Sequence, residues 1–207
     1  MTANLSYAGD NKEFMLSNLH DSAGIYTPIR FFIRDKYLTD RKIQRCPTTG
    51  DVSRTEAWED VYAYGFKGDY NGERIRRMRS DVLGMGYSGN NYDILVINTK
   101  AIPKISSFFL NGDSREPNMK KQRCDVDMIE GAAATNNNRF AAIHPSGKMN
   151  LNFADGHAAS TDPLDYVSMA LYDWPKPAVR GSGTNVYWLD RYGILRVKWW
   201  FYGESVR

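Results

Sequence analysis

A run of alternating apolar and polar residues that ends at a glycine turn constrains this fold most. In Met149–Phe153 every second residue is apolar, which is the period of a half-buried β-strand. Asp155-Gly156 follows. Glycine adopts positive φ at little cost and aspartate tolerates it, so the pair favours a type I′ hairpin turn. The pattern predicts two antiparallel strands, over 149–154 and 157–161.

Length and composition favour one domain over residues 1–207, built largely from sheet. The 207 residues include 13 tyrosines, 9 phenylalanines and 5 tryptophans, residues that favour strands. The net charge of +3 is too small, and its basic residues too dispersed, to indicate a nucleic-acid partner. No segment approaches the roughly 20 apolar residues of a membrane helix.

The order of the predicted elements indicates an α+β fold with an antiparallel sheet. A helix is expected up to about Gly9, followed by a turn and an irregular stretch, and a loop over 20–28. Polar residues predict a long surface excursion over 111–138. The remaining patterns predict helices over 29–37, 68–89 and 163–171, and strands over 61–66, 92–98, 105–110, 139–143, 186–189 and 195–202.

Histidines near the turn raise the question of a metal site. His144, Asp155 and His157 have ligand-type side chains, and His144, Asn152 and His157 resemble the His-Asn-His set of a metal-dependent nuclease. That set needs a helix after its hairpin, whereas His157 follows the turn at once. We therefore interpret Asp155-Gly156 as a turn, with the histidines hydrogen-bonding the loop, and expect no catalytic metal.

Cysteines are few. Two, Cys46 and Cys124, indicate neither a disulfide framework nor a four-ligand zinc site. One disulfide between them and two buried thiols are both compatible with the sequence. Neither cysteine has a neighbouring histidine in the sequence, so nucleophilic catalysis has little support.

Several motifs, taken in order, resemble the bacterial pilin-like proteins of type II secretion and prepilin type. The C-terminal domain of these proteins has a signature of a His, a nine-residue gap and Asp-Gly. Residues that match family landmarks are Tyr7-Ala8-Gly9-Asp10-Asn11, Cys46-Pro47, Tyr64-Gly65-Phe66, Pro103 through Asp113-Ser114, and the signature residues His144, Asn150, Phe153, Ala154, Asp155, Gly156 and His157.

The resemblance has departures. Ten residues rather than nine separate His144 from Asp155, and Ile143 replaces the usual Arg. Residues 174–207 match no landmark and form a C-terminal extension. Family members begin with a basic leader, a peptidase site and a long apolar helix. The resemblance therefore implies that residues 1–20 are the end of that helix, with the anchor missing, and that 139–161 is the signature hairpin.

The resemblance implies a pilin-like fold, in which a helix stub packs on an antiparallel sheet with long loops and a C-terminal β-hairpin. The expected function is that of a structural subunit of a pseudopilus or type IV pilus-like filament, and not an enzyme. Expected partners are other pilin-like subunits, the secretion machinery and secreted cargo. The full-length protein would be anchored in the inner membrane and face the periplasm or cell surface.

Some pseudopilins hold a structural Ca²⁺ in a C-terminal loop. Candidate oxygen ligands here are Asp113, Asp125 and Asp127, although their spacing does not match an EF-hand. No other cofactor is expected.

Two alternative functions remain open from the sequence. The tail aromatics Trp188, Trp199, Trp200 and Tyr202 would suit a secreted carbohydrate-binding or adhesion module. A metal-dependent hydrolase that uses His144 and His157 is the third reading.

Overall fold

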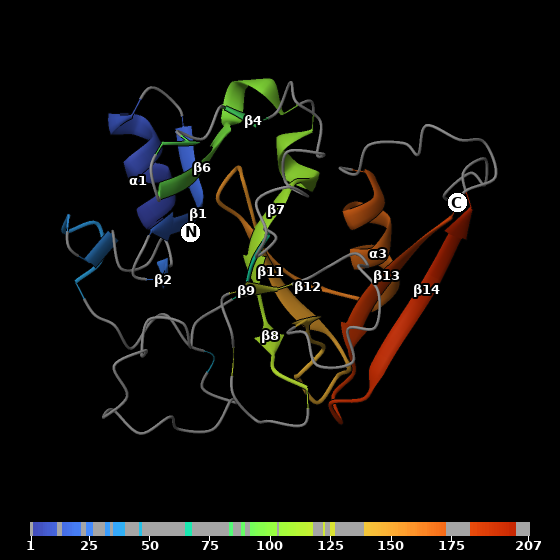
Figure 1. Cartoon of the computed structure of the whole chain (residues 1–207). Helices are drawn as coiled ribbons and strands as arrows, with labels where there is room; N and C mark the ends of the chain where they lie inside the picture. Colours follow the sequence, from blue (N-terminus) through green and yellow to red (C-terminus); the bar gives the residue numbers. More distant parts are fainter. Residues whose placement is uncertain are drawn as a thin grey trace.

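Within the residues that it describes, the computed structural model contains two α-helices and several small, mainly antiparallel sheets, so the predicted α+β class is confirmed (Figure 1). It describes residues 2–11, 14–21, 24–26, 32–33, 35–39, 46, 65–67, 83–84, 88–89, 92–102, 104–117, 122, 125–126, 139–172 and 183–201. Within these residues, no helix is long and apolar enough to cross a membrane.

The described elements are mostly short strands, with a few helices among them. In chain order they are α1 (Thr2–Asp10), β1 (Phe14–Asp21), β2 (Gly24–Tyr26), β3 (Gly65–Lys67), β4 (Leu83–Gly84), β5 (Ser88–Gly89), β6 (Tyr92–Asn98), the 3-10 helices η4 (Thr99–Ala101) and η5 (Ile105–Ser107), β7 (Phe109–Gly112), β8 (Ser114–Arg115), β9 (Asp125–Val126), β10 (Arg139–Phe140), β11 (Met149–Phe153), β12 (Ala158–Thr161), α3 (Pro163–Tyr172), β13 (Gly183–Leu189) and β14 (Leu195–Phe201).

Helix α1 packs on the N-terminal sheet, which has the order β2-β1-β6-β4 with β5 also paired to β6. The buried Asn4 joins helix to strand: its Nδ2 donates to Leu16 O at 3.0 Å, and Leu16 N donates to its Oδ1 at 3.1 Å. Ala8 of α1 is buried in one cluster with Met15 of β1 and Ile97 of β6. The helix is thus fixed by both hydrogen bonds and apolar burial.

The central sheet has the order β12-β11-β7-β3-β9 and is antiparallel except for the parallel pair of β3 and β9. In β11, Met149, Leu151 and Phe153 are buried and the two asparagines between them are half-buried. This confirms the period-two prediction. All four residues of β7 are buried, because β7 lies between β11 and β3.

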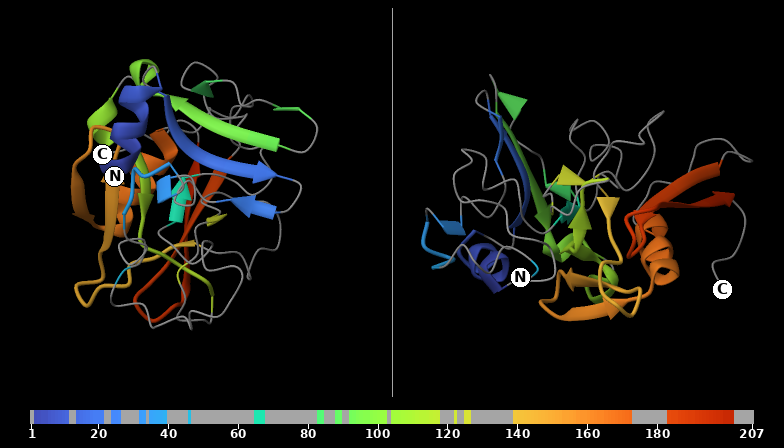
Figure 2. Two further views of the ribbon diagram at one scale, coloured as in Figure 1. Left: turned by 90° about the vertical axis from the view of Figure 1, so that its left-hand side faces the viewer. Right: turned by 90° about the horizontal axis from the view of Figure 1, so that it is seen from below.

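A C-terminal hairpin of β13 and β14 and the helix α3 complete the fold. Helix α3 contributes Tyr166, Val167 and Ala170 to the main buried apolar cluster, which also contains Phe109 and Phe140. Figure 2 shows α1 and the N-terminal sheet on one side of the central strands, and α3 and the hairpin on the other.

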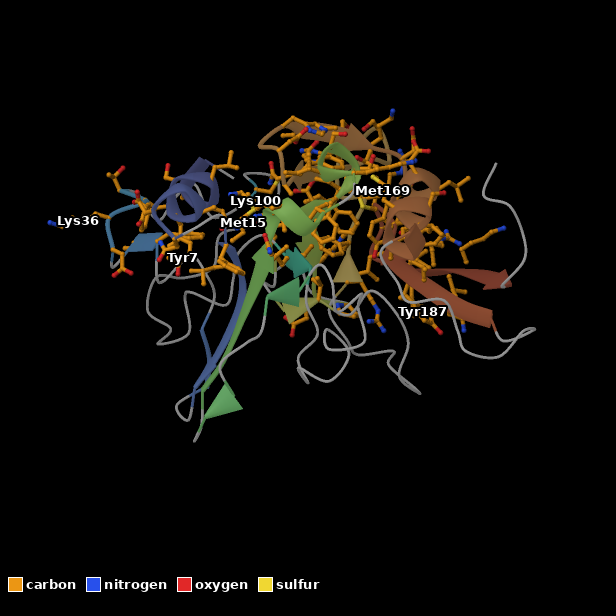
Figure 3. All side chains as sticks on the ribbon, turned by 90° about the horizontal axis from the view of Figure 1, so that it is seen from above. Tyr7, Met15, Lys36, Lys100, Met169 and Tyr187 are labelled. Carbon is orange, nitrogen blue, oxygen red and sulfur yellow. The ribbon has the colours of Figure 1, made fainter. Side chains whose placement is uncertain are left out.

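The same division appears in the side chains. In Figure 3, Tyr7 and Met15 lie on the α1 side, whereas Met169 and Tyr187 lie on the α3 side. Tyr166 links its helix to β13, because its hydroxyl donates to Tyr187 O at 3.3 Å. Burial raises the pKa of Tyr166 well above the usual range, so this phenol stays protonated.

The predicted hairpin at Asp155-Gly156 is confirmed, but its predicted turn type is wrong. Gly156 has φ +98, and Asp155 is not among the described residues with positive φ. Gly156 N donates to Phe153 O, and Phe153 N donates to His157 O, both at 2.9 Å. This is a type I turn closed by a glycine bulge, which needs positive φ only at the glycine, whereas type I′ needs it at two residues.

Four other predictions are corrected near the N-terminus and in the middle of the chain. The helix ends at Asp10, so the second half of the predicted 1–20 helical end is strand β1, which pairs with β6. The predicted loop over 20–28 contains β2. The predicted helix over 68–89 ends in strands β4 and β5. The predicted strand over 105–110 begins with η5.

The predicted surface excursion over 111–138 is also wrong over residues 111–114 and at 122 and 126, whereas 115–117 are partly exposed. Asn111, Asp113, Ser114, Gln122 and Val126 are buried, since β7, β8 and β9 run through this segment.

The predicted strand over 92–98, the helix over 163–171 and the hairpin within 186–202 are confirmed over their described parts. The predicted strand over 139–143 is shorter than expected: β10 covers Arg139–Phe140, and Ala141 adds an isolated bridge to Leu189. The predicted helix over 29–37 is wrong in its second half: residues 32–33 are helical, but 35–36 form a turn and 37 a bend. Most of 68–89, and Asp127, Cys124 and 61–64, lie outside the described residues.

Candidate functional site

A buried polar cluster forms where β7 ends, beside the loop that precedes β11. Asp113 directly follows β7, and its backbone is held on both sides: its N–H donates to Asn150 O at 3.0 Å, and Ala141 N donates to its carbonyl at 2.9 Å. Its side chain is fully buried. The strands on either side therefore fix the position of this carboxylate.

His144 reaches Asp113 from a tight loop. Gly147 N donates to His144 O at 2.8 Å, and His144 N lies 3.4 Å from Lys148 O. Gly147 closes this loop with φ +74, which a glycine adopts without strain. The imidazole is 22% exposed, so it lies at the border between the buried carboxylate and solvent.

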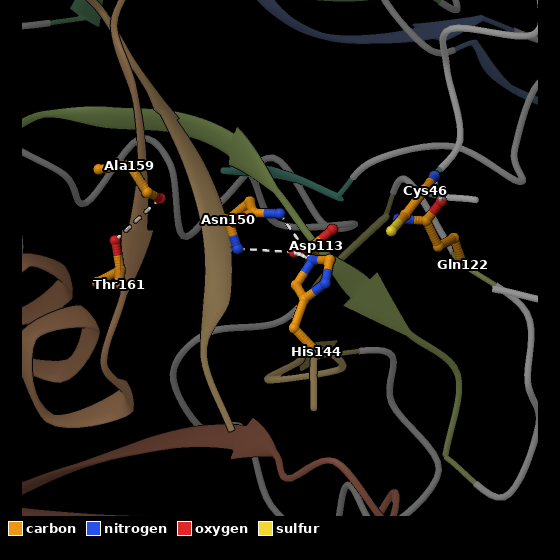
Figure 4. Close-up of polar contacts among 7 residues, drawn as sticks. All are labelled: Cys46, Asp113, Gln122, His144, Asn150, Ala159 and Thr161. Atoms are coloured by element: carbon orange, nitrogen blue, oxygen red, sulfur yellow. Dashed lines mark hydrogen bonds and ion pairs between the residues drawn. The ribbon is translucent and has the colours of Figure 1, made fainter. Parts of the chain in front are cut away.

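The signature residue Asn150 completes the contact (Figure 4). Its backbone N–H donates to Asp113 Oδ2 at 2.6 Å, and His144 Nε2 lies 2.9 Å from the same oxygen. The side-chain Nδ2 of Asn150 lies 2.7 Å from His144 Nε2. Asp113 Oδ2 thus contacts two signature residues, through the Asn150 N–H and His144 Nε2.

Burial is the largest influence on the acidity of Asp113, and it raises the pKa. The Asn150 N–H, His144 and the Cys46 thiol act in the opposite direction without cancelling the effect of burial, so the pKa of Asp113 remains raised. The cluster therefore disfavours the negative charge on Asp113 unless a positive group lies beside it.

Cys46 lies on the other side of Asp113 from Asn150 (Figure 4). Its backbone N–H donates to Gln122 Oε1 at 2.6 Å, and both residues are buried. One ligand-type atom from each of Cys46, Asp113 and His144 lies within 4.8 Å of the other two. Within the described part of the chain, this is the one group of three cysteine, histidine or acidic side chains close enough to hold a metal.

The signature turn forms a separate site. Asp155 Oδ1 accepts from His157 N at 3.2 Å and lies 2.6 Å from the ring Nδ1. The ring stacks on Phe153, with centroids 4.2 Å apart and planes 5° apart. Slight desolvation tends to raise the pKa of Asp155, but the hydrogen bonds from His157 outweigh it and lower that pKa. Both contacts fix His157 at the turn.

The structure groups the predicted site residues differently from the sequence. One group is the polar cluster of Cys46, Asp113, His144 and Asn150. The other group is the turn, with Phe153, Asp155, Gly156 and His157. Asn152 pairs with Asn111 through Nδ2 at 2.5 Å. His144, Asn152 and His157 thus have different partners and do not form a His-Asn-His set.

The calcium candidates are also separated. Asp125 lies in β9, which β3 separates from β7, while Asp113 faces His144. Asp127 lies outside the described residues. The pairing of Cys46 with Cys124 stays a prediction, because Cys124 is not described.

Sequence reasoning missed that Cys46 and Asp113 are neighbours of His144. Each belonged to a landmark of the resemblance, but no spacing rule links residues so far apart.

Comparison with protein-family models, with curated proteins and with solved structures gave no match.

Proposed function

We propose that this chain is the head domain of a pilin-like filament subunit, of the kind that builds type II secretion pseudopili and type IV pilus-like filaments. Its role would be structural and not enzymatic. An apolar helix that continues α1 towards the N-terminus would pack in the filament, and the head would face outwards. Neighbouring subunits, the secretion machinery and secreted cargo would be its partners.

One observation carries this proposal: residues from three separate family landmarks meet in one cluster. Cys46, Asp113, His144 and Asn150 come from three landmarks of the resemblance, spread over residues 46 to 150. Chance matches scattered along a chain have no reason to meet in space. Their meeting supports the resemblance as that of a whole domain and not of isolated motifs.

The attachment of α1 gives further support. Asn4 hydrogen-bonds β1, and Leu5 lies against the signature turn at Gly156. A longer helix that enters through α1 would therefore be attached to the head at two points. Heads held at high local concentration by such helices need only modest contacts with one another.

The proposal is tested on the full-length protein in the cell that encodes it. Antibody against residues 1–207 should label filaments sheared from the cell surface, and the label should disappear when the prepilin peptidase is deleted. Full-length protein found dispersed in the medium in both strains, with no labelled filament, would contradict the proposal. Retention of that dispersed protein on a glycan array would instead favour the carbohydrate-binding alternative.

A second measurement tests whether filament assembly is driven by the head or by the helix. Purified 1–207 should remain monomeric or weakly associated in light scattering at micromolar concentration. Long filaments formed by this chain alone would show that the helix does not drive assembly.

A further inference from the structure

The polar cluster has the donor set of a transition-metal site. A thiol, a carboxylate and an imidazole nitrogen, from Cys46, Asp113 and His144, offer ligand atoms that all lie within 4.8 Å of one another. Thiolate sulfur, histidine nitrogen and carboxylate oxygen are the three ligand types that zinc sites combine. These ligands arrive from three separate segments: the residue-46 segment, the end of β7, and the loop before β11.

The hydrogen bonds at His144 Nε2 conflict with one another. This nitrogen lies 2.9 Å from Asp113 Oδ2 and 2.7 Å from Asn150 Nδ2. A neutral ring nitrogen has either one proton or one lone pair in the ring plane. It cannot donate to the carboxylate and accept from the amide at the same time. Turning the amide brings Asn150 Oδ1 to this position, and then two acceptors share one proton.

The carboxylate itself is incompletely satisfied. Asp113 has a relative exposure of 0%, so solvent does not reach it. Its Oδ1 has no hydrogen-bond partner among the described residues. A buried charged oxygen without a partner costs free energy, unless a cation lies beside it. This is a second observation, independent of the ligand types, and it points to a missing positive group.

We propose that Cys46, Asp113 and His144 bind one divalent transition metal of the zinc type. The Cys46 thiol would lose its proton to solvent, and the metal would bind the resulting thiolate, one carboxylate oxygen of Asp113 and the lone pair of His144 Nε2. The amide oxygen of Asn150 or a water would occupy the fourth position of a tetrahedral site. Calcium and magnesium are disfavoured, because both prefer an all-oxygen ligand set.

This site differs from the candidate calcium ligands, since it uses Asp113 but neither Asp125 nor Asp127. It also differs from the alternative of a metal-dependent hydrolase, since it uses His144 without His157. It does not depend on the filament proposal, because metal binding is measured on the isolated chain. Its effect would be to tie three distant segments of the chain together.

Metal binding is tested on purified 1–207 that has been stripped with a chelator and then dialysed against Zn²⁺ or Co²⁺. Elemental analysis should find one zinc per chain, and zinc should raise the melting temperature. The Co²⁺ form should show a thiolate-to-cobalt charge-transfer band. Cys46→Ser should abolish that band, and Asp113→Asn or His144→Ala should weaken zinc binding at least about tenfold.

The matched control is His157→Ala, which removes a histidine of the same signature but outside the cluster and should leave zinc affinity unchanged. Circular dichroism establishes which variants fold, and the cobalt spectrum of the unsubstituted chain needs no variant. A folded chain that gives no charge-transfer band would overturn the proposal. So would equal losses in His144→Ala and His157→Ala, or a Cys46–Cys124 disulfide found by mass spectrometry without reduction.

Discussion

Gly156 of the signature turn lies directly against Leu5 of α1. A Cβ built on Gly156 would lie 2.6 Å from Leu5 Cδ1, and no other neighbour of that Cβ lies closer than 3.9 Å. The turn and the N-terminal helix, which lie about 150 residues apart in the sequence, are therefore in van der Waals contact. The positive φ favours glycine here, and a Cβ would in addition displace the end of the Leu5 side chain.

Gly156→Ala should destabilise the fold by about 1–3 kcal/mol, because its φ of +98 strains a residue with a Cβ. Gly147→Ala is the matched control: Gly147 also has positive φ, but a Cβ there meets nothing within 4 Å. Chemical denaturation of both variants measures the two losses. The excess loss at Gly156 reports the contact with Leu5.

A double-mutant cycle isolates that contact. Leu5→Ala should relieve part of the cost of Gly156→Ala and none of the cost of Gly147→Ala. If Leu5→Ala shifts both glycine variants equally, α1 does not pack on the turn as described.

The centre of the sheet has a stricter requirement for glycine at Gly112. A Cβ there would lie 2.6 Å from the backbone oxygen of Asn150, and a backbone atom cannot rotate away as a side chain can. Gly112→Ala should therefore push β7 from β11 and cost about 1–3 kcal/mol. It should also loosen the Asn150 N–H from Asp113, because that N–H belongs to the same residue.

Gly9→Ala is the control for Gly112→Ala. A Cβ at Gly9 meets nothing within 4 Å, and alanine favours helix over glycine. This substitution in α1 should stabilise the chain by about 0.5 kcal/mol. If thermal unfolding shows equally lowered melting temperatures for Gly112→Ala and Gly9→Ala, the close approach of β7 and β11 is contradicted.

Elements with local signals could be predicted from the sequence. The alternation of Met149–Phe153, the Asp162-Pro163 start of α3, and the aromatic strands around Asp190–Gly193 each specify their structure within a few residues. The predicted turn type was wrong, because the turn includes one residue more than the Asp155-Gly156 pair. Asp-Gly suits both turn types, and the sequence does not reveal that Ala154 belongs to the turn.

Elements that depend on distant partners could not be predicted. Phe14–Asp21 has no clear alternation, and it is a strand because β6 pairs with it from almost 80 residues away. The polar cluster has the same origin. The polar sequence around Asp113 predicts a surface loop, but the backbone of β11 and of residue 141 holds Asp113 in the interior.

The attachment of α1 to β1 gives another test. Asn4 is 2% exposed and makes two hydrogen bonds with the backbone of Leu16. Asn4→Ala removes both bonds and leaves buried backbone groups without these partners, so it should cost about 2–3 kcal/mol. Asn11→Ala is the control, since Asn11 makes one side-chain bond, to Tyr7 O, at a partly exposed position. Its loss should be at most about 1 kcal/mol, and equal losses in denaturation would contradict the role of Asn4.

The loop of the C-terminal hairpin predicts a pH dependence. Asp190 Oδ1 accepts from the backbone N–H groups of Tyr192 and Ile194, at 2.9 and 3.0 Å, and its Oδ2 accepts two bonds from Arg196. Partial burial tends to raise the pKa of Asp190, but these hydrogen bonds and the charge of Arg196 outweigh it and lower the pKa below 3.8. Folding therefore favours the charged form.

Because the folded pKa is lowered, this stabilisation is complete above the unfolded value of 3.8 and is lost as pH falls through the folded pKa. Asp190→Asn should thus cost about 1 kcal/mol at neutral pH. The difference from the unsubstituted chain should shrink steadily below pH 3.8 in urea denaturation. Lys148→Gln, which breaks the exposed 3.1 Å pair with Asp162, should cost at most about 0.5 kcal/mol at neutral pH. A cost of Asp190→Asn that stays constant down to pH 2 would show that the charge on Asp190 does not stabilise the hairpin.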